Sequence, residues 1–552
     1  MSIIFFNYKS MKYVKSFLVL LAFAGLSISV AQAQNTYSIV KKGSIGNAYF
    51  VYFNGTNLFG GATAAPIQQC IDTIKVEANG NPCTIQFGSG SNALDLGGGS
   101  ATLITFNGGS SGNDWGEITL TGRATTTANA TDGAIYLKNG VSIISNAHIT
   151  GTEGKLIYNN SSTITVNSDT ISLTGSSGYA IWNVYPGTLT VNGGTVRATD
   201  NGNAIYSGDG NVTINIISGT VSSTTGCAIM NDFGAVTISG GTISATTGRS
   251  LQNSNTSTIN ISGGTLTSAG DAITNASGVI NISGTAKILT TTTGVQSAIY
   301  SYGPTGAINI SGGEVNGGNS YAIYSSSGGN ITVSGGTVTS ESDNTKSTIH
   351  IDNAVASIEI TGGKVLAQEG YAMYIQEGSG AVSGGVVFSY GADNTDIIFN
   401  GSYGMLTGNG VIIAWNAAAG TTTYTAGTTD NIVQYPATAT AVWAKQSGSG
   451  GISYTNGTNT GFIPIEGVTV TGGTGIEETQ GIASLQVYPN PVKDVLNFSF
   501  EASYKITDLQ GRILQESDVT VKSANISNLP TGIYFVSLTT ETGKSVKKII
   551  KE

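Results

Sequence analysis

Val236-Thr237-Ile238-Ser239-Gly240-Gly241-Thr242-Ile243-Ser244 returns with small changes through the middle of this 552-residue chain. It comes back as Ile259-Asn260-Ile261-Ser262-Gly263-Gly264-Thr265-Leu266-Thr267, and further copies span 308–315, 331–339 and 358–365. Short runs of β-branched residues that alternate with polar ones predict strands, and a glycine pair predicts a tight turn. Each copy therefore predicts two strands joined by a turn.

A second repeated phrase, most often ending in Ala-Ile, lies between the copies of the first. Its aliphatic residue recurs every 22 to 26 residues, at Ile135, Ile157, Ile181, Ile205, Ile229, Leu251, Ile273, Ile299, Ile323, Ile349 and Met373. A period in the twenties is typical of solenoids, and β-branched strands favour a parallel β-helix over a leucine-rich repeat. The column predicts eleven coils over residues 118–390. At ~4.8 Å per coil they would form a rod of roughly 50 Å.

Alternation along each strand predicts which side chains form the core. Ile238 and Ile243 should point inward, and Thr242 and Ser244 outward. One coil cannot bury its apolar face alone, so neighbouring coils supply the stability and both ends need caps.

Residues 34–117 are predicted to form the N-terminal cap and the first strands. After Pro66, four apolar residues lie on one face of a short helix that would cover the first coil: Ile67, Cys70, Ile71 and Ile74. Strand-like segments follow at 83–87, 103–106 and 118–120. Downstream, residues 391–471 lose the period but keep β character, which predicts a terminal β cap.

The composition excludes several classes of protein. Only 10% of residues are charged and 39% are hydrophobic, with 78 glycines, which favours an all-β repeat protein over a disordered one. The formal net charge is −9, whereas nucleic-acid binding needs a basic surface. The two histidines, His148 and His350, and the three cysteines lack metal-ligand spacing. We therefore expect no nucleic-acid partner, no metal and no cofactor.

Three cysteines are too few for a disulfide scaffold. Cys70 and Cys83 are close enough in sequence to form one disulfide in an oxidising compartment. Two buried thiols explain them equally well, because free cysteine is often buried. Cys227 is expected at or near the core.

The N-terminus predicts a secretory signal peptide over residues 1–33. An apolar run from 17 to 30 is followed by Ala31-Gln32-Ala33, and the basic residues before it are Lys9, Lys12 and Lys15. This order predicts cleavage between Ala33 and Gln34. Met11 is an alternative start, because the signal is complete from there. No later apolar stretch reaches the roughly 18 residues of a spanning helix, so no transmembrane helix is expected in the mature chain.

A new domain is predicted after a linker at 472–484, because the glycine repeats stop and proline, lysine and leucine return. Residues 485–552 carry Tyr488-Pro489-Asn490-Pro491, then Gly511-Arg512, then Leu529-Pro530-Thr531-Gly532-Ile533-Tyr534 and a lysine-rich ending. In order and spacing these motifs closely resemble the type A C-terminal sorting domain of the type IX (Por) secretion system. About seven short strands with turn residues between them predict a small Ig-like β-sandwich.

This resemblance implies export in two steps. The chain would cross the inner membrane by the Sec pathway, and the folded passenger would then pass through the outer membrane with the type IX secretion machinery as its partner. In this family the sorting domain is usually removed, and the passenger is anchored to lipopolysaccharide or released. We therefore expect an extracellular protein or one anchored at the outer-membrane surface. A C-terminal Ig-like binding module is the alternative.

The repeat region resembles the right-handed parallel β-helix proteins of the pectate-lyase-like superfamily. The predicted fold is thus all-β: a right-handed parallel β-helix with a short N-terminal capping helix, a small β region and a C-terminal Ig-like β-sandwich. The resemblance is architectural and does not imply the activity of those proteins.

Polysaccharide lyases and hydrolases need converging carboxylates, for acid and base catalysis or for Ca²⁺. The outward column after the glycine pair is instead mostly threonine, and reads Thr195, Thr220, Thr242, Thr265, Thr285, Glu314, Thr337 and Lys364. The best carboxylate cluster would comprise Glu341, Asp343, Asp352 and Glu359, near Glu314 and Lys364. Solvated turn charges explain these residues more simply, so we assign no catalytic residue.

An aromatic column follows the Ala-Ile phrase. Its members are Tyr136, Tyr158, Trp182, Tyr206, Tyr300, Tyr324 and Tyr374, and it is interrupted by Met230, Gln252, Thr274 and His350. Each member is adjacent to an inward aliphatic residue and should point outward, where ring faces can stack on sugars. Stacking between neighbouring coils, which stabilises the ladder, is the simpler explanation.

Two further patterns are weaker. Rows such as Thr242/Ser244 and Thr265/Thr267 are similar to those of ice-binding solenoids, but Arg197, Lys287 and Lys364 interrupt the array. Asp72-Thr73-Ile74 and Asp169-Thr170-Ile171 match a short O-glycosylation pattern of bacteria with this secretion system, and three residues match by chance often.

Together these observations predict an exported β-helix that acts as a non-catalytic adhesive or structural passenger and contacts glycans or matrix. A polysaccharide-degrading enzyme, a lyase or glycoside hydrolase on a β-helix, is the competing class, and a pure spacer is a third.

Overall fold

A computed structural model describes most of the chain outside its N-terminus and the region around 416–486. The described residues are 35–41, 49–58, 66–88, 92–109, 114–292, 294–341, 346–367, 371–390, 398–407, 411–415, 444–446, 451–456, 459–464, 487–508, 512–540 and 543–552. The predicted signal-peptide residues Ala31, Ala33 and Gln34 lie outside this set, so the signal peptide stays a prediction.

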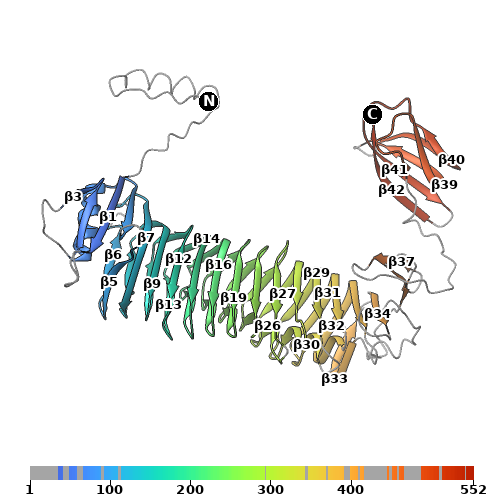
Figure 1. The fold of residues 1–552 in the computed structure, drawn as a ribbon. Helices are drawn as coiled ribbons and strands as arrows, with labels where there is room; N and C mark the ends of the chain where they lie inside the picture. The colour runs from blue at the N-terminus through green and yellow to red at the C-terminus, as the bar shows by residue number, and fades with distance from the viewer. Residues whose placement is uncertain are drawn as a thin grey trace, which may run out of the picture.

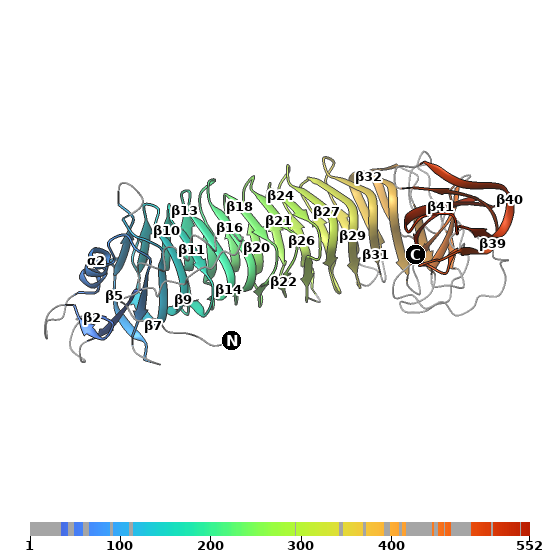
Figure 2. The ribbon, with the colours of Figure 1, turned by 90° about the horizontal axis from the view of Figure 1, so that it is seen from above.

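Most described strands belong to one solenoid in which strands of successive coils pair in parallel (Figures 1 and 2). The first column of strands consists of β6 (Ile104–Asn107), β8 (Ile135–Lys138), β10 (Lys155–Asn160), β13 (Tyr179–Val184), β15 (Asn203–Ser207), β17 (Cys227–Asn231), β20 (Arg249–Asn253), β23 (Ile273–Asn275), β26 (Ser297–Ser301), β28 (Tyr321–Ser325), β30 (Ser347–Ile351), the start of β32 (Tyr371–Tyr390) and β33 (Ile398–Thr407).

Two more columns complete each coil. The second contains β4 (Cys83–Phe87), β11 (Thr163–Val166), β18 (Ala235–Ile238), β21 (Thr258–Ile261) and β24 (Val279–Ile282). The third contains β5 (Leu94–Gly99), β12 (Thr170–Leu173), β19 (Thr242–Ala245), β22 (Thr265–Ser268), β25 (Lys287–Thr290) and β34 (Val411–Trp415). Longer strands run through both: β7 (Ile118–Ala128), β9 (Ser142–Gly151), β14 (Thr188–Ala198), β16 (Thr213–Ser223), β27 (Ala307–Asn316), β29 (Asn330–Ser340), β31 (Ser357–Ala367) and β32.

The predicted aliphatic column is confirmed by the strand register. Ile181 pairs with Ile157 on one side and Ile205 on the other, and the same step continues to Met373. All eleven side chains are buried. The parallel pairing extends beyond 118–390 at both ends, because Ile135 pairs with Ile104 and Met373 with Ile398.

The strands alternate as predicted, and the glycine pair has a steric reason. Ile238 and Ile243 are buried, whereas Thr242 is exposed. A Cβ at Gly240 would lie 2.3 Å from the carbonyl oxygen of Ile217 in the preceding coil. Gly241 has a φ of +79°, a backbone conformation that residues other than glycine rarely adopt. The pair therefore permits both the close approach of coils and the turn.

One member of the predicted threonine column is wrong. The partner of Thr265 in the next coil is Lys287, and Thr285 lies in the turn before it. In the other coils of this column a glycine comes directly before the outward residue, whereas this coil has Gly284 followed by Thr285 and Ala286 before Lys287.

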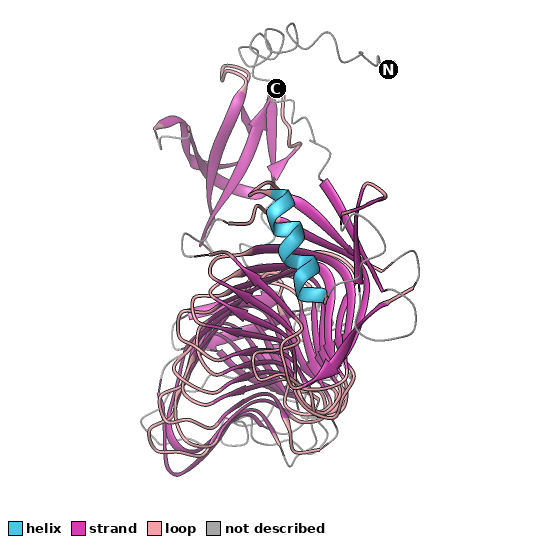
Figure 3. Ribbon diagram, turned by 90° about the vertical axis from the view of Figure 1, so that its left-hand side faces the viewer, coloured by secondary structure: helices cyan, strands magenta, loops and turns pink. Residues whose placement is uncertain are grey.

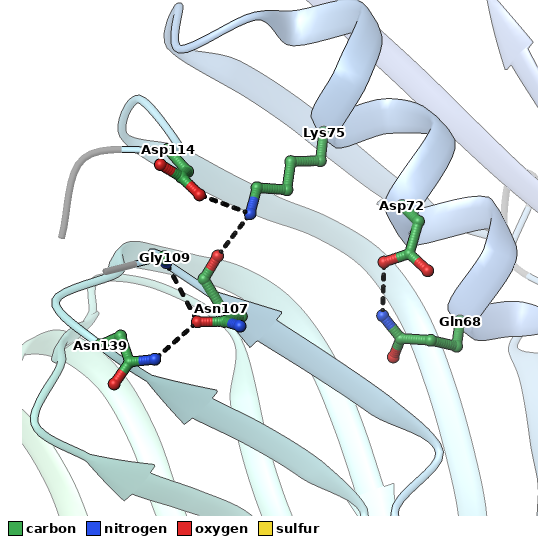
Figure 4. A network of polar contacts seen from close by, with 7 residues as sticks. All are labelled: Gln68, Asp72, Lys75, Asn107, Gly109, Asp114 and Asn139. Atoms are coloured by element: carbon green, nitrogen blue, oxygen red, sulfur yellow. Dashed lines mark hydrogen bonds and ion pairs between the residues drawn. The ribbon is translucent and has the colours of Figure 1, made fainter. Parts of the chain in front are cut away.

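The predicted capping helix is confirmed as α2 (Ile67–Ala78), which lies across the N-terminal end of the solenoid (Figure 3). Its buried face contains Ile67, Cys70, Ile71, Ile74 and Ala78. Beside this face, the Lys75 ammonium donates to the carbonyl oxygen of Asn107 (2.9 Å) and pairs with Asp114 (3.2 Å), as Figure 4 shows. A hairpin of β1 (Asn35–Lys41), β2 (Tyr49–Phe53) and β3 (Thr56–Asn57) joins the same end, because β1 pairs with β4.

The described residues after 415 form two separate antiparallel sheets. The first contains β35 (Ala444–Gln446), β36 (Gly451–Asn456) and β37 (Asn459–Pro464). The second contains β38 (Val487–Tyr488), β39 (Val495–Thr507), β40 (Ile513–Asn525), β41 (Gly532–Thr540) and β42 (Gly543–Lys551). The predicted Ig-like sandwich of about seven strands is not confirmed, because these five strands form one connected sheet.

The described helical residues contain no segment long and apolar enough to cross a membrane.

Candidate functional site

The predicted aromatic residues form a strip along the outer side of the first strand column. The aromatic strip comprises Tyr136, Tyr158, Trp182, Tyr206, Tyr300, Tyr324, His350 and Tyr374. Consecutive members are register partners, except where Met230, Gln252 and Thr274 separate Tyr206 from Tyr300. The side chains are neither fully exposed nor fully buried. The strip is thus split into an N-terminal and a C-terminal cluster.

In the N-terminal cluster the rings contact each other from coil to coil. Tyr136 stacks on Tyr158 with centroids 5.2 Å apart, and Trp182 meets Tyr206 edge to face at 4.9 Å. Tyr179, from the neighbouring outward position, adds a third ring against this pair at 4.9 and 5.0 Å. These contacts agree with the prediction that aromatic stacking stabilises the ladder.

Lys155 completes this cluster with a positive charge. Its ammonium lies 3.4 Å from the Trp182 ring centroid and 4.9 Å from that of Tyr158, and it donates to the carbonyl oxygen of Thr131 at 2.6 Å. Burial lowers the pKa of Lys155, while the Asp132 carboxylate acts in the opposite direction. A cation over ring faces is a favourable contact of roughly 0.5–2 kcal/mol, so Lys155 covers part of the tryptophan face.

The C-terminal cluster is built around His350. Its imidazole stacks on Tyr374 with centroids 4.3 Å apart and meets Tyr324 edge to face at 5.0 Å. Tyr300 stacks on Tyr324 at 5.5 Å, and Tyr321 adds a further ring at 5.2 Å from Tyr324. The interruption predicted at His350 is therefore no gap, since the imidazole continues the ladder.

Polar groups lie beside the rings in both clusters. The Tyr206 hydroxyl donates to Asp232 (2.8 Å), and the Tyr324 hydroxyl donates to Asp352 (2.7 Å). Burial, followed by the adjacent carboxylate, raises the pKa of both tyrosines. The Asn160 amide donates to the Tyr136 hydroxyl at 3.0 Å. Rings edged by carboxylate and amide groups offer both stacking surface and hydrogen-bonding groups, which is the chemistry that sugars need.

His350 gives the C-terminal cluster a predicted pH dependence. Its Nε2 lies 2.6 Å from Asp352, and burial nevertheless lowers the pKa of His350 below its usual value. A lowered folded-state pKa means that the unfolded chain binds the proton more readily, so stability is lost as pH falls through the usual histidine range. We expect the melting temperature to fall between about pH 7 and pH 5. The fall should be smaller in His350→Phe, which keeps a ring but cannot titrate, and equal falls would contradict the assignment.

The predicted carboxylate cluster does not converge among the described residues. Asp352 directly follows strand β30 of the first column, Glu359 is the register partner of Thr332 in the second, and Glu314 lies in the third, 3.7 Å from Lys287. Lys364 is two coils from Glu314 in that third column. Asp343 lies outside the described residues. Within the described ranges no three His, Cys, Asp or Glu side chains are grouped as metal ligands.

All three cysteines are buried free thiols, with no disulfide between Cys70 and Cys83. Burial raises the pKa of Cys70 to about 12 and that of Cys83 to about 11. Cys227 is also buried, as expected, and its thiol lies 3.5 Å from Gln252 Oε1. The sequence left open a disulfide or two buried thiols for Cys70 and Cys83, and the structure contains two buried thiols.

An asparagine ladder inside the solenoid was missed by sequence reasoning. Two residues after the aliphatic column, fully buried amides donate from coil to coil: Asn159 to Asn183 (2.6 Å), Asn231 to Asn253 (3.0 Å) and Asn253 to Asn275 (2.9 Å). The recurrence of asparagine at this spacing was the available signal. The ladder satisfies the buried Oδ1 atoms of Asn183, Asn253 and Asn275, which would otherwise be costly to bury, whereas those of Asn159 and Asn231, where each described run begins, accept no hydrogen bond.

The C-terminal motifs have clear structural roles. The Asn490 amide donates to the carbonyl oxygen of Lys548 (3.0 Å), and its Oδ1 accepts from the backbone of Ile550 (2.9 Å), so the Tyr-Pro-Asn-Pro segment holds strand β42. The Asp508 carboxylate accepts from the backbone N–H and the guanidinium of Arg512, the arginine of the Gly-Arg motif (2.9 and 3.0 Å).

The remaining motif opens strand β41. The Tyr534 hydroxyl donates to the carbonyl oxygen of Pro530 at 2.7 Å. Gly532 is the first residue of the strand, and Leu529 packs against the domain core. Of the predicted motif residues, Tyr488 is exposed, Pro489 and Pro491 follow cis peptide bonds, and Gly511 lies outside the described residues.

Fold and motifs define the class: a parallel β-solenoid passenger followed by a separate C-terminal β domain. The family described as the secretion system C-terminal sorting domain matches residues 486–552. These residues are a type IX sorting domain, and the protein is exported to the cell surface or the extracellular space.

Two further comparisons each match a short span of this chain. β-Agarase D of Zobellia galactanivorans is 38% identical over 74 residues, which are 13% of this chain and 15% of the agarase. PorZ, an essential surface component of the type IX secretion system of Porphyromonas gingivalis, is 16% identical over 20% of this chain and 16% of PorZ, with a TM-score of 0.13. The matched spans thus cover less than one fifth of either protein.

Proposed function

We propose that the solenoid is a non-catalytic adhesive or structural passenger that contacts glycans or matrix through the aromatic strip. The observation that carries this proposal is the pairing of a ring ladder with a carboxylate at its edge in both clusters, joined by an amide in the N-terminal cluster. A strip of partly exposed rings on a rigid rod presents repeated contacts to an extended polysaccharide. Many weak contacts on one scaffold then add up to useful avidity.

The absence of catalysis is part of the same proposal. Of the acidic residues singled out from the sequence, Asp352, Glu359 and Glu314 lie at three different columns, and the aromatic strip carries Asp232 and Asp352 singly, each bonded to a tyrosine. A glycosidase mechanism needs two carboxyl groups roughly 5–9.5 Å apart across the scissile bond. Release of reducing ends or unsaturated products from a polysaccharide by the purified protein would instead favour the polysaccharide-degrading enzyme.

Glycan contact is tested by replacing three rings of the C-terminal cluster. We expect Tyr300→Ala/Tyr324→Ala/Tyr374→Ala to weaken retention on immobilised polysaccharide about tenfold or more, because the stacking surface is lost. Agarose, cellulose and pectin columns provide three glycan chemistries. The measurement is the retained fraction of purified protein on each column.

Two controls separate binding from folding. Tyr→Leu at the same three positions keeps apolar packing in the ladder without aromatic rings, and should lose retention while its thermal unfolding stays close to that of the parent. Thr242→Ala/Thr265→Ala changes the third column, remote from the strip, and should bind normally. If both ring variants fold and are retained like the parent, the rings do not bind glycans and serve only to stack one coil on the next.

A further inference from the structure

The sorting domain exposes a large share of the chain's apolar side chains. Among the described residues fifteen large hydrophobic side chains are exposed, and eight of them lie in this domain. They are Tyr488, Val495, Ile513, Val519, Ile533, Phe535, Val546 and Ile550. Single exposed apolar residues are ordinary on soluble proteins, whereas neighbouring ones mark interaction surfaces.

Five of these residues share one side of the sheet. Phe535 of β41 pairs with Lys548 of β42 and with Thr507 of β39, and Thr507 pairs with Ile513 of β40. Along β41 and β42, Ile533 pairs with Ile550, and Val546 pairs with Ser537. Side chains alternate along a strand, and the intervening Tyr534, Val536 and Leu538 are buried. We call Ile513, Ile533, Phe535, Val546 and Ile550 the outer face.

Polar groups are interspersed on the same side. Lys548 is exposed opposite Phe535, and Lys505, the register partner of Ser537, forms an ion pair with Glu516 at 2.7 Å. An apolar centre with an aromatic residue and a charged rim is the usual composition of a protein–protein interface. Because Glu516 already balances Lys505, the charge that favours a carboxylate on the partner surface is that of Lys548.

We propose that the outer face is the surface by which the sorting domain docks on a protein of the secretion machinery, one with an apolar patch and an acidic rim. The proposal rests on the sorting role of residues 486–552 and adds the surface that is recognised. The motifs support this arrangement: Gly532-Ile533-Tyr534 directs the tyrosine into the core and the isoleucine outward, and Asn490 fixes the strand that carries Ile550. The motifs thus build the sheet, and the sheet presents the outer face.

The test uses the full chain in its own secreting cell. We expect Phe535→Ser/Ile550→Ser to lower the surface-exposed and released fraction about tenfold, with accumulation in the periplasm, because two anchors of the contact are removed. Lys548→Glu should reduce export, whereas Lys548→Arg, which keeps the positive charge, should be exported like the parent. The matched control is Val519→Ser, a more exposed apolar residue of β40 outside the outer face; it should be exported normally.

Each alternative outcome decides the question. If deletion of residues 485–552 blocks export but Phe535→Ser/Ile550→Ser is exported like the parent, the outer face is not the docking surface and the sorting role stands. If the deletion is itself exported, the sorting role fails and this proposal with it. Equal loss in Val519→Ser would show sensitivity of the whole surface, which overturns the assignment.

A membrane is the other candidate occupant of an apolar, lysine-bearing face. Purified full-length protein can be sedimented with vesicles of phosphatidylethanolamine and phosphatidylglycerol. We expect no difference between the parent and Phe535→Ser/Ile550→Ser. Binding by the parent that the variant loses would assign the face to lipid and overturn the protein partner.

Discussion

Deleting residues 485–552 is expected to abolish surface display and leave the passenger in the periplasm. The deleted residues contain the whole family match and the whole five-stranded sheet, with its own core around Leu496, Ile506 and Val536. The solenoid has a separate core, so the passenger should still fold. Quantitative immunoblots of surface, released and periplasmic fractions measure the effect, which should approach complete loss of export.

The control for this deletion is a change of similar kind that leaves the sheet intact. Removal of the predicted linker 472–484 should not block export, because the sorting domain keeps all its strands. Normal display of the protein without residues 485–552 would refute the sorting role of this domain and leave the alternative of an Ig-like binding module.

The solenoid was predictable because its signals are local and repeated. Each coil has to bury one aliphatic residue such as Ile229 and has to turn where Gly241 allows a positive φ, so both leave a period in the sequence. The helix α2 was predictable for a similar reason, since its apolar residues recur at helical spacing above a core that would otherwise be open.

Features that depend on contacts between coils were harder to predict. Asn253 has the composition of a turn residue, and only the stacking of one coil on the next gives its amide a buried partner above and below. Thr285 was assigned to the wrong column because an irregular turn shifts the count of residues within one coil. In the C-terminal domain, β39 and β40 are 13 residues each with register shifts between them, and the sequence divided them into shorter strands.

The candidate site shows the same division between local and long-range information. Sequence placed the aromatic residues in one outward column, and the register confirms that they are neighbours. Lys155 and Tyr179 also contact these rings, from the outward position two residues before the buried aliphatic residue of each coil. The sequence does not reveal this position, because the type of residue found there changes from coil to coil. His350 looked like an interruption, although an imidazole stacks on Tyr374 as a phenol would.

The buried asparagine ladder is expected to contribute strongly to stability, and Asn253→Ala tests it. The substitution removes the bond accepted from Asn231 (3.0 Å) and the bond donated to Asn275 (2.9 Å), and leaves both neighbours with a buried polar atom that has lost its ladder partner. Each such group costs about 1–3 kcal/mol, so we expect a loss of about 2–4 kcal/mol in the free energy of unfolding. Urea denaturation of the purified passenger measures it.

The solenoid supplies a matched control, because a second asparagine ladder runs along its outside. Asn281 donates to Asn260 and accepts from Asn309, both at 2.9 Å, so it too has one amide partner in each neighbouring coil, but with access to water. Water can replace either bond, so Asn281→Ala should cost less than about 0.5 kcal/mol. The two ladders run in opposite donor directions but offer each asparagine the same two amide partners, and burial is their main difference. Equal losses at Asn253 and Asn281 would mean that desolvation is not what makes the inner ladder matter. A large loss at Asn253 alone would show that the solenoid depends on a polar column inside its apolar core, which specifies the stacking register coil by coil.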